Sequence, residues 1–184
     1  MQQQQQNEIP DPRLDLNPAT LQDLQKSLYA WQIYNFGEQD DERIILGICE
    51  EAGELCHAIL KSEQGIRGTP EEHEAAMKDA IGDIMVYTFN YLSGIEKDIP
   101  SFLPDKTPPT DDVVKVRRAA MTIFRNVAKM TDSKTVDADA RSLVYSINYL
   151  CALKGWNLEE ILRETWAEVG KRDWRKYPQT GLPA

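Results

Sequence analysis

Residues 81–92 read IGDIMVYTFNYL, and this stretch decides the fold. It is apolar on almost every face of a helix, so we expect it to be the buried part of a helix over about residues 71–92. Asp83 interrupts the apolar run. With about 100° of rotation per residue, Asp79, Asp83 and Asn90 fall on one narrow line along that helix. Because a buried carboxylate without a partner costs several kcal/mol, this line predicts a site that needs compensating positive charge.

The matching acids lie in CEEAGELCHAIL, residues 49–60, inside a predicted helix over about residues 41–61. Glu51 and Glu54 lie about 60° and 120° from the centre of its apolar stripe, whereas Glu50 lies nearly opposite. Two small residues, Gly47 and Ala58, lie between them on the helix surface and allow another helix to approach closely. The stripe itself consists of Ile44, Ile48, Ala52, Leu55 and Ile59.

Pairing these two faces would gather four carboxylates, and the least costly compensation is a hard divalent cation with oxygen ligands. The residues alone leave two alternatives open. Glu-x-x-Glu on a helix is often a solvated edge, and an arginine could be the partner of Asp83. Candidates for that role are Arg43, Arg67 or an arginine of the fourth predicted helix.

The remainder of the chain has helical periods and no alternating strand pattern, so the predicted fold class is an all-α bundle of about six helices. Residues 1–16 form a polar tail, and residues 178–184 are a second tail. The domain over 17–177 divides into halves at 17–95 and 111–177, joined by a proline-rich connector at 96–110. Asn17 and Pro18 predict the start of the first helix, and the sixth should run from Asn157 to about Trp174.

The charge balance limits the classes of partner. The chain has 30 Asp and Glu against 21 Lys and Arg, a net charge of −9, which argues against binding nucleic acid or anionic membranes by charge alone. No apolar run approaches the roughly 18 residues of a membrane span. The three cysteines are an odd count without C-x-x-C spacing, so we expect reduced thiols and a cytoplasmic protein.

Several segments together resemble the MazG-like all-α nucleoside triphosphate pyrophosphohydrolases. They are EEAGEL at 50–55, GD at 82–83 with Asn90 seven residues later, WQIYNFG at 31–37, SEQGIRG at 62–68 and ETWAEVGKRDW at 164–174. The last three are similar to phage-type members. The similarity covers about residues 20–92 and 141–177.

The resemblance implies Mg²⁺-dependent hydrolysis, with Mn²⁺ as a substitute, between the α and β phosphates of a (deoxy)nucleoside triphosphate. It also implies a dimer or tetramer in a bacterial or phage-infected cell. Glu51, Glu54 and Asp83 match three of four family metal ligands. The residue expected three before Asp83 is Ala80, so Asp79, on the same helix face, is carried over as the fourth.

The remaining assignments concern the water and the nucleotide. Glu50 is the candidate general base, although its helical position argues against this. Lys171 and Arg172 match a basic pair that contacts phosphate, or they favour a helix C-terminus. Trp31 stacks on the base or belongs to the core. Asn35 and Asn90 are candidates to hydrogen-bond base or sugar.

Two segments of the chain also resemble each other. MVYTFNYL at 85–92 and LVYSINYL at 143–150 share five of eight residues, so the second half is a candidate degenerate copy of the first. In that alignment arginines replace the acids, and Arg118 is a candidate substrate contact. Chance similarity with solvated arginines accounts for the pattern equally well.

Two other functions compete with hydrolysis. Glu54-x-x-His57 suggests a di-iron bundle, which requires a second such motif that the chain lacks. The other is a helical module without catalysis that senses nucleotide or binds a protein partner.

Overall fold

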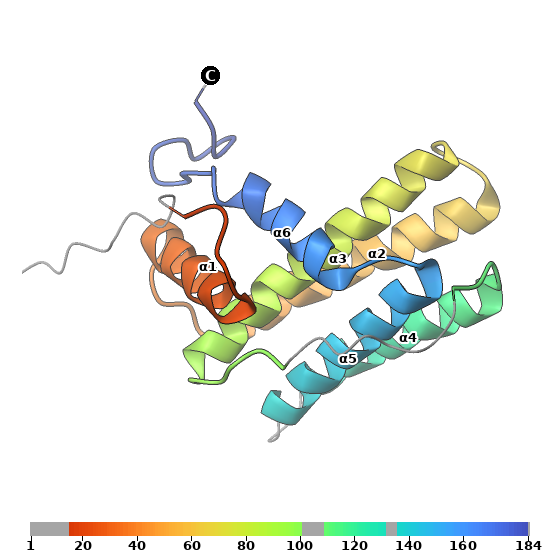
Figure 1. Cartoon of the computed structure of the whole chain (residues 1–184), viewed down its shortest axis with the longest axis horizontal. Helices are drawn as coiled ribbons and strands as arrows, with labels where there is room; N and C mark the ends of the chain where they lie inside the picture. The colour runs from red at the N-terminus through yellow and green to blue at the C-terminus, as the bar shows by residue number, and fades with distance from the viewer. Residues whose placement is uncertain (1–14, 101–108, 132–135, 184) are drawn as a thin grey trace, which may run out of the picture.

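Six α-helices account for the regular structure of the residues that the computed structural model describes, which are 15–100, 109–131 and 136–183 (Figure 1). They are α1 (Leu21–Phe36), α2 (Asp41–Gln64), α3 (Pro70–Gly94), α4 (Val113–Met130), α5 (Val136–Lys154) and α6 (Leu158–Val169). No strand occurs in those ranges, so the all-α prediction is confirmed. Within them, no helix is both long and apolar enough to cross a membrane. The predicted tail at 1–16 and the connector at 96–110 lie largely outside the described residues.

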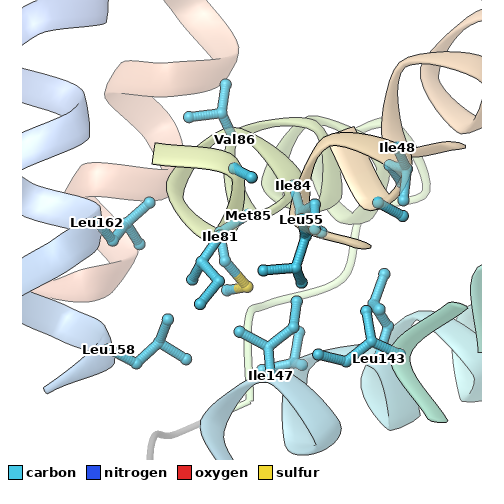
Figure 2. Close-up of a cluster of buried hydrophobic side chains, with 14 of the residues drawn as sticks. Ile48, Leu55, Ile81, Ile84, Met85, Val86, Leu143, Ile147, Leu158 and Leu162 are labelled. Atoms are coloured by element: carbon cyan, nitrogen blue, oxygen red, sulfur yellow. The ribbon is translucent and has the colours of Figure 1, made fainter. Parts of the chain in front are cut away.

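Helix α3 is the centre of the bundle, as its apolar sequence predicts. It packs against α1, α2, α5 and α6, and side chains from these helices belong to one core. Figure 2 shows the part of this core where α2, α3, α5 and α6 meet. Ile81, Ile84 and Met85 are completely buried, and each contributes roughly 1.5–3 kcal/mol of stabilisation relative to an exposed position. Gly82 lets Thr165 of α6 lie directly against the α3 backbone. The predicted apolar stripe of α2 is buried throughout.

Two helical hairpins make up most of the molecule. One consists of α2 and α3, and the other of α4 and α5 (Figure 1). Helix α2 packs on α4, and α3 packs on α5. These are the contacts expected when each helix of a duplicated hairpin meets its own counterpart, so the arrangement is compatible with the predicted repeat.

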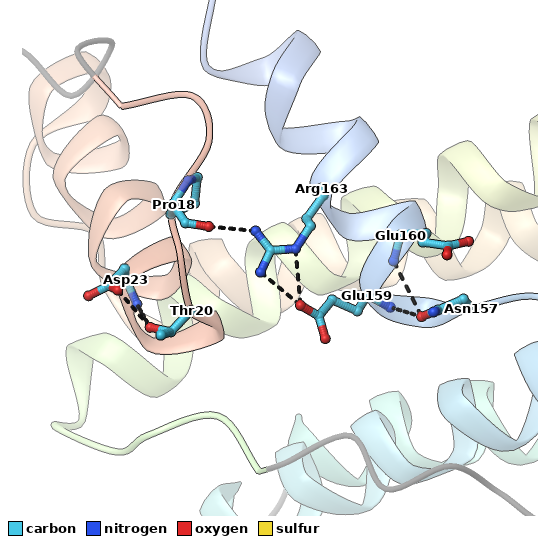
Figure 3. A network of polar contacts seen from close by, with 7 residues as sticks. All are labelled: Pro18, Thr20, Asp23, Asn157, Glu159, Glu160 and Arg163. Carbon is cyan, nitrogen blue, oxygen red and sulfur yellow. Dashed lines mark hydrogen bonds and ion pairs between the residues drawn. The ribbon is translucent and has the colours of Figure 1, made fainter.

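The start of α1 differs from the prediction. Thr20, not Asn17, is the N-cap, and its hydroxyl accepts a hydrogen bond from the backbone N–H of Asp23 at 3.1 Å (Figure 3). Pro18 is buried outside the helix, and its carbonyl accepts a hydrogen bond of 2.6 Å from Arg163 of α6. This tertiary contact holds the segment before α1 against α6, so the helix begins three residues later than its proline suggested.

The end of α6 also differs, because the helix stops at Val169 instead of continuing to about Trp174. The backbone N–H of Trp174 donates to the Asn35 side chain at 2.7 Å, and the carbonyl of Arg172 accepts from the Trp31 indole at 2.9 Å. Both bonds replace those that a continued helix would make. The chain therefore turns back over α1, and Lys171 and Arg172 lie in this turn instead of in a helix.

Candidate functional site

Five carboxylates face one another across the α2–α3 hairpin. Helix α2 carries Glu50, Glu51 and Glu54, and α3 carries Asp79 and Asp83. Among the described residues, none of the five makes a hydrogen bond or an ion pair, although many other acids of the chain do. Clustered acids without partners repel one another, so this part of the surface is built to receive positive charge.

Glu51 and Asp83 are the two carboxylates of the cluster whose pKa values are raised. Burial, followed by the charges of neighbouring carboxylates, raises the pKa of Glu51 to about 7. Those neighbours are Asp83, Glu54, Glu50 and Asp79. Burial and then Asp79 raise the pKa of Asp83 to about 6, while Arg172 acts in the opposite direction. The cation that acts on Asp83 is therefore Arg172, whereas Arg43, one of the arginines expected as its partner, pairs with Asp40 at 3.6 Å.

Glu51 and Asp83 open into a cavity of about 380 Å³ between α1, α2, α3 and the turn after α6, which we call the aromatic cavity. Its apolar wall includes Trp31, Phe36, Val86, Tyr87 and Trp174. Glu50, Asn90 and Arg172 line it as well. Gln32, Gln39 and Arg43 also line it, so the cavity joins an apolar wall to polar and charged groups, as small-molecule sites commonly do.

The side-chain oxygen of Asn90 is one of two buried polar atoms that have no hydrogen-bond partner in the described residues. Its side chain is only 3% exposed, and its Oδ1 atom makes no hydrogen bond within the described residues. Buried amide oxygens are nearly always hydrogen-bonded, so an unpaired one beside a cavity indicates a group supplied by a ligand. The predicted role of Asn90 toward base or sugar stays a prediction.

The predicted close approach at Gly47 is occupied by Tyr87. A Cβ atom at Gly47 would lie 2.5 Å from Cε1 and Cζ of the Tyr87 ring. Burial, and then the charges of Glu51 and Glu50, raise the pKa of Tyr87. The missing side chain of Gly47 thus allows the phenol ring to stand between α2 and α3 as a wall of the aromatic cavity.

The turn after α6 completes the aromatic cavity, and α1 holds that turn in place. The Trp31 side chain is 6% exposed, donates to the Arg172 carbonyl and packs edge-on against Phe36. It therefore belongs to the core and also lines the cavity. Asn35 bridges the Trp31 carbonyl and the Trp174 N–H, and it does not line the cavity. Asn35 positions the turn instead of facing a ligand.

Glu54 and Asp79 line a second cavity of about 750 Å³, on the side of the hairpin nearer the α2–α3 loop. Glu50 is exposed and lines both cavities, so they meet at its side chain. The four predicted metal ligands are therefore shared between two adjoining hollows. Asp79 lines the second cavity with Glu54, whereas Asp83, its expected neighbour on the same helix face, lines the aromatic cavity.

Two predicted substrate contacts lie away from both cavities. Lys171 pairs with Glu168 at 2.7 Å, and Arg118 is exposed on α4. Of the other arginines in the second half, Arg117 pairs with Glu63 at 2.6 Å and Arg141 with Asp137 at 3.1 Å. Among the described residues, Arg172 is the predicted phosphate contact that lies at the carboxylates.

The carboxylate oxygens are the type of ligand that a hard metal ion prefers, but their positions do not form a complete set of ligands. Among the described residues, no three His, Cys, Asp or Glu side chains are grouped tightly enough to ligate one ion. However, the donor set is oxygen-rich, unpaired and carried on two facing helices, which suits Mg²⁺.

The sequence did not single out Tyr87, Trp174 or His73 as parts of this region, and it named His57 only in a motif that suggested a di-iron bundle. The small residue at position 47 was the signal for Tyr87, since it predicted a close neighbour without naming it. Both histidines line the second cavity. Comparison with known proteins adds no assignment, because no protein-family model, curated protein or solved structure matched the chain significantly.

Proposed function

We propose that this protein is a Mg²⁺-dependent pyrophosphohydrolase that converts a (deoxy)nucleoside triphosphate into the monophosphate and pyrophosphate. The observation that carries the proposal is the unpaired carboxylate cluster at the junction of an aromatic cavity and a polar one. The sequence resemblance to MazG-like enzymes supports the same activity and names the same acids.

The chain's own residues divide the work in this proposal. Glu51, Glu54, Asp79 and Asp83 would hold Mg²⁺, with Mn²⁺ as a substitute. When bound, the metal supplies charge neutralisation for the phosphates and a water of lowered pKa. Arg172 lies beside Asp83 and contributes positive charge at the entrance to the aromatic cavity.

The aromatic cavity suits a nucleoside. Trp31, Phe36 and Trp174 offer apolar surfaces to the base, and the Asn90 amide oxygen can accept a hydrogen bond from base or sugar. Glu50 stands where the two cavities meet, so it remains the candidate general base. In the reaction, the water oxygen bonds to the α-phosphorus and its proton passes to a carboxylate. The bond to the bridging oxygen breaks, and its electron pair leaves on pyrophosphate.

The deciding experiment is a panel of every common NTP and dNTP with purified protein and Mg²⁺, with monophosphate and pyrophosphate measured as products. We expect release from at least one nucleotide, and loss of turnover in Glu54→Gln with an unchanged circular dichroism spectrum. Glu164→Gln, an exposed site on α6 outside both cavities, is the matched control. Binding without release from any nucleotide would favour the sensing module over the enzyme.

The resemblance also implies self-association, which we retain as part of the proposal. Helices α4 and α5 expose Met121, Phe124 and Tyr145, an apolar surface suited to contact with a second copy. Light scattering after size-exclusion chromatography measures the mass in solution. A monomer at all concentrations would contradict this part of the proposal without affecting the reaction.

A further inference from the structure

The second cavity changes character along its length. Glu54 and Asp79 line it near the carboxylate cluster, whereas His57, Lys61, Arg67 and His73 line it toward the α2–α3 loop. Lys61 is seven residues beyond Glu54 on the same helix, a rise of about 10 Å. A long hollow with acids at one end and bases at the other fits a ligand whose metal-bound part sits at the acids and whose anionic part extends beyond them.

Arg67 and Lys61, the two cations at the loop end, form no ion pair with another described residue. Arg67 is exposed and makes no hydrogen bond or ion pair with another described residue. Lys61 contacts only the neutral amide of Gln64 among those residues, at 3.0 Å. Glu72, the nearest acid at this end, already accepts a hydrogen bond of 2.7 Å from the Thr69 backbone in a capping box.

A buried histidine gives independent support for a ligand. The His73 side chain is 6% exposed and lines the cavity, and its Nε2 atom is buried without a hydrogen-bond partner in the described residues. A Cβ atom at Gly68 would lie 3.2 Å from its ring, so the loop closes tightly over it. An anion at the loop end of the cavity would satisfy this nitrogen when it carries a proton.

We propose that the loop end of the second cavity is the subsite for the two terminal phosphates of the substrate, and hence for the departing pyrophosphate. This inference rests on the proposed function. Arg67 and Lys61 bind phosphate oxygens, and His73 donates a hydrogen bond to them. The nucleoside occupies the aromatic cavity, and the α-phosphate lies at the carboxylates where the cavities meet. Substrates are therefore recognised by their triphosphate as well as by their base.

The test measures binding of inorganic pyrophosphate, in the presence of Mg²⁺, by isothermal titration calorimetry. The variant is Lys61→Gln with Arg67→Asn, since asparagine tolerates the positive φ of 61° that Arg67 adopts. The control is Lys26→Gln with Lys129→Gln, which removes the same charge at exposed sites on α1 and α4. We expect pyrophosphate affinity about tenfold or more weaker in the cavity variant, and within about twofold of wild type in the control.

Two further measurements separate the possible causes. Circular dichroism confirms that both variants are folded, and titration with nucleoside monophosphate should give an unchanged affinity, because that ligand does not reach the loop end. Wild-type protein that binds no pyrophosphate overturns the subsite. Equal affinity in wild type and cavity variant, or equal losses in both variants, also overturns it. The nucleotide panel judges the proposed function separately, because a protein that hydrolyses a triphosphate while the cavity variant keeps full pyrophosphate affinity refutes only the subsite.

Discussion

Replacing Glu51 with glutamine should stabilise the metal-free protein while removing its response to Mg²⁺. The carboxyl of Glu51 has its pKa raised from 4.5 to about 7. Between pH 4.5 and about pH 7, the Glu51 carboxyl therefore keeps its proton in the folded protein but loses it in the unfolded chain. Stability therefore falls as pH rises through this interval, and at pH 8 the full cost of the charge is present.

The magnitude follows from that shift. A rise from 4.5 to about 7 corresponds to at most about 3 kcal/mol at pH 8. Glu51 is only half-buried, so solvent screening reduces the expected gain from Glu51→Gln to about 1–2 kcal/mol. For a protein of this size the midpoint of thermal unfolding should rise by roughly 3–6 °C. No hydrogen bond to another described residue is lost, because Glu51 makes none.

The assay is thermal unfolding at pH 8 with a chelator and then with Mg²⁺, for wild type, Glu51→Gln and the Glu164→Gln control. Wild type and the control should gain stability from Mg²⁺, and Glu51→Gln should gain much less. The reasoning is refuted if Glu51→Gln is no more stable than wild type in chelator. It is also refuted if Mg²⁺ stabilises both proteins equally.

Three further measurements probe the same hairpin and the turn after α6. Without metal, the free energy of unfolding in urea should fall from about pH 5 to pH 8 as the two half-buried carboxyls ionise, and a flat or rising profile would contradict this. Gly47→Ala should destabilise the protein by about 1–3 kcal/mol because the Tyr87 ring must move. Gly53→Ala, on the same helix but with open space around it, should stabilise the protein by about 0.5–1 kcal/mol. Urea unfolding compares the two variants, and equal changes in the free energy of unfolding would exclude the close contact between Gly47 and Tyr87. Arg172→Gln should lower kcat/KM about tenfold or more, and Lys171→Gln should leave it nearly unchanged. Equal values of kcat/KM for the two variants in steady-state assays would contradict the placement of Arg172, and not Lys171, at the site.

Local sequence patterns predicted most of the α2–α3 hairpin. The apolar stripe of α2, the buried length of α3 and the space at Gly47 all follow from helical periodicity and residue size. Asp79 could be placed beside Asp83 for the same reason. These predictions succeed because a helix repeats every 3.6 residues whatever it packs against.

The two helix boundaries that were wrong have tertiary causes. Pro18 is a good first residue of a helix, yet Arg163 holds its carbonyl outside α1. Gly170 follows Val169 directly and caps the helix, and beyond it Trp31 and Asn35 bind the backbone in a turn. In both places the hydrogen-bond partner lies more than 130 residues away along the chain. A local sequence pattern therefore cannot predict it.

The sequence by itself determined an all-α protein with acids on the facing sides of two neighbouring helices. Only the tertiary structure decided which cation stands beside them, and it selected Arg172 in a turn after α6. It also divided the carboxylates between two cavities and brought His73 and Arg67 to the end of one of them. The physical reason is that periodicity specifies which face of a helix is buried, whereas the partner of that face depends on how distant segments pack.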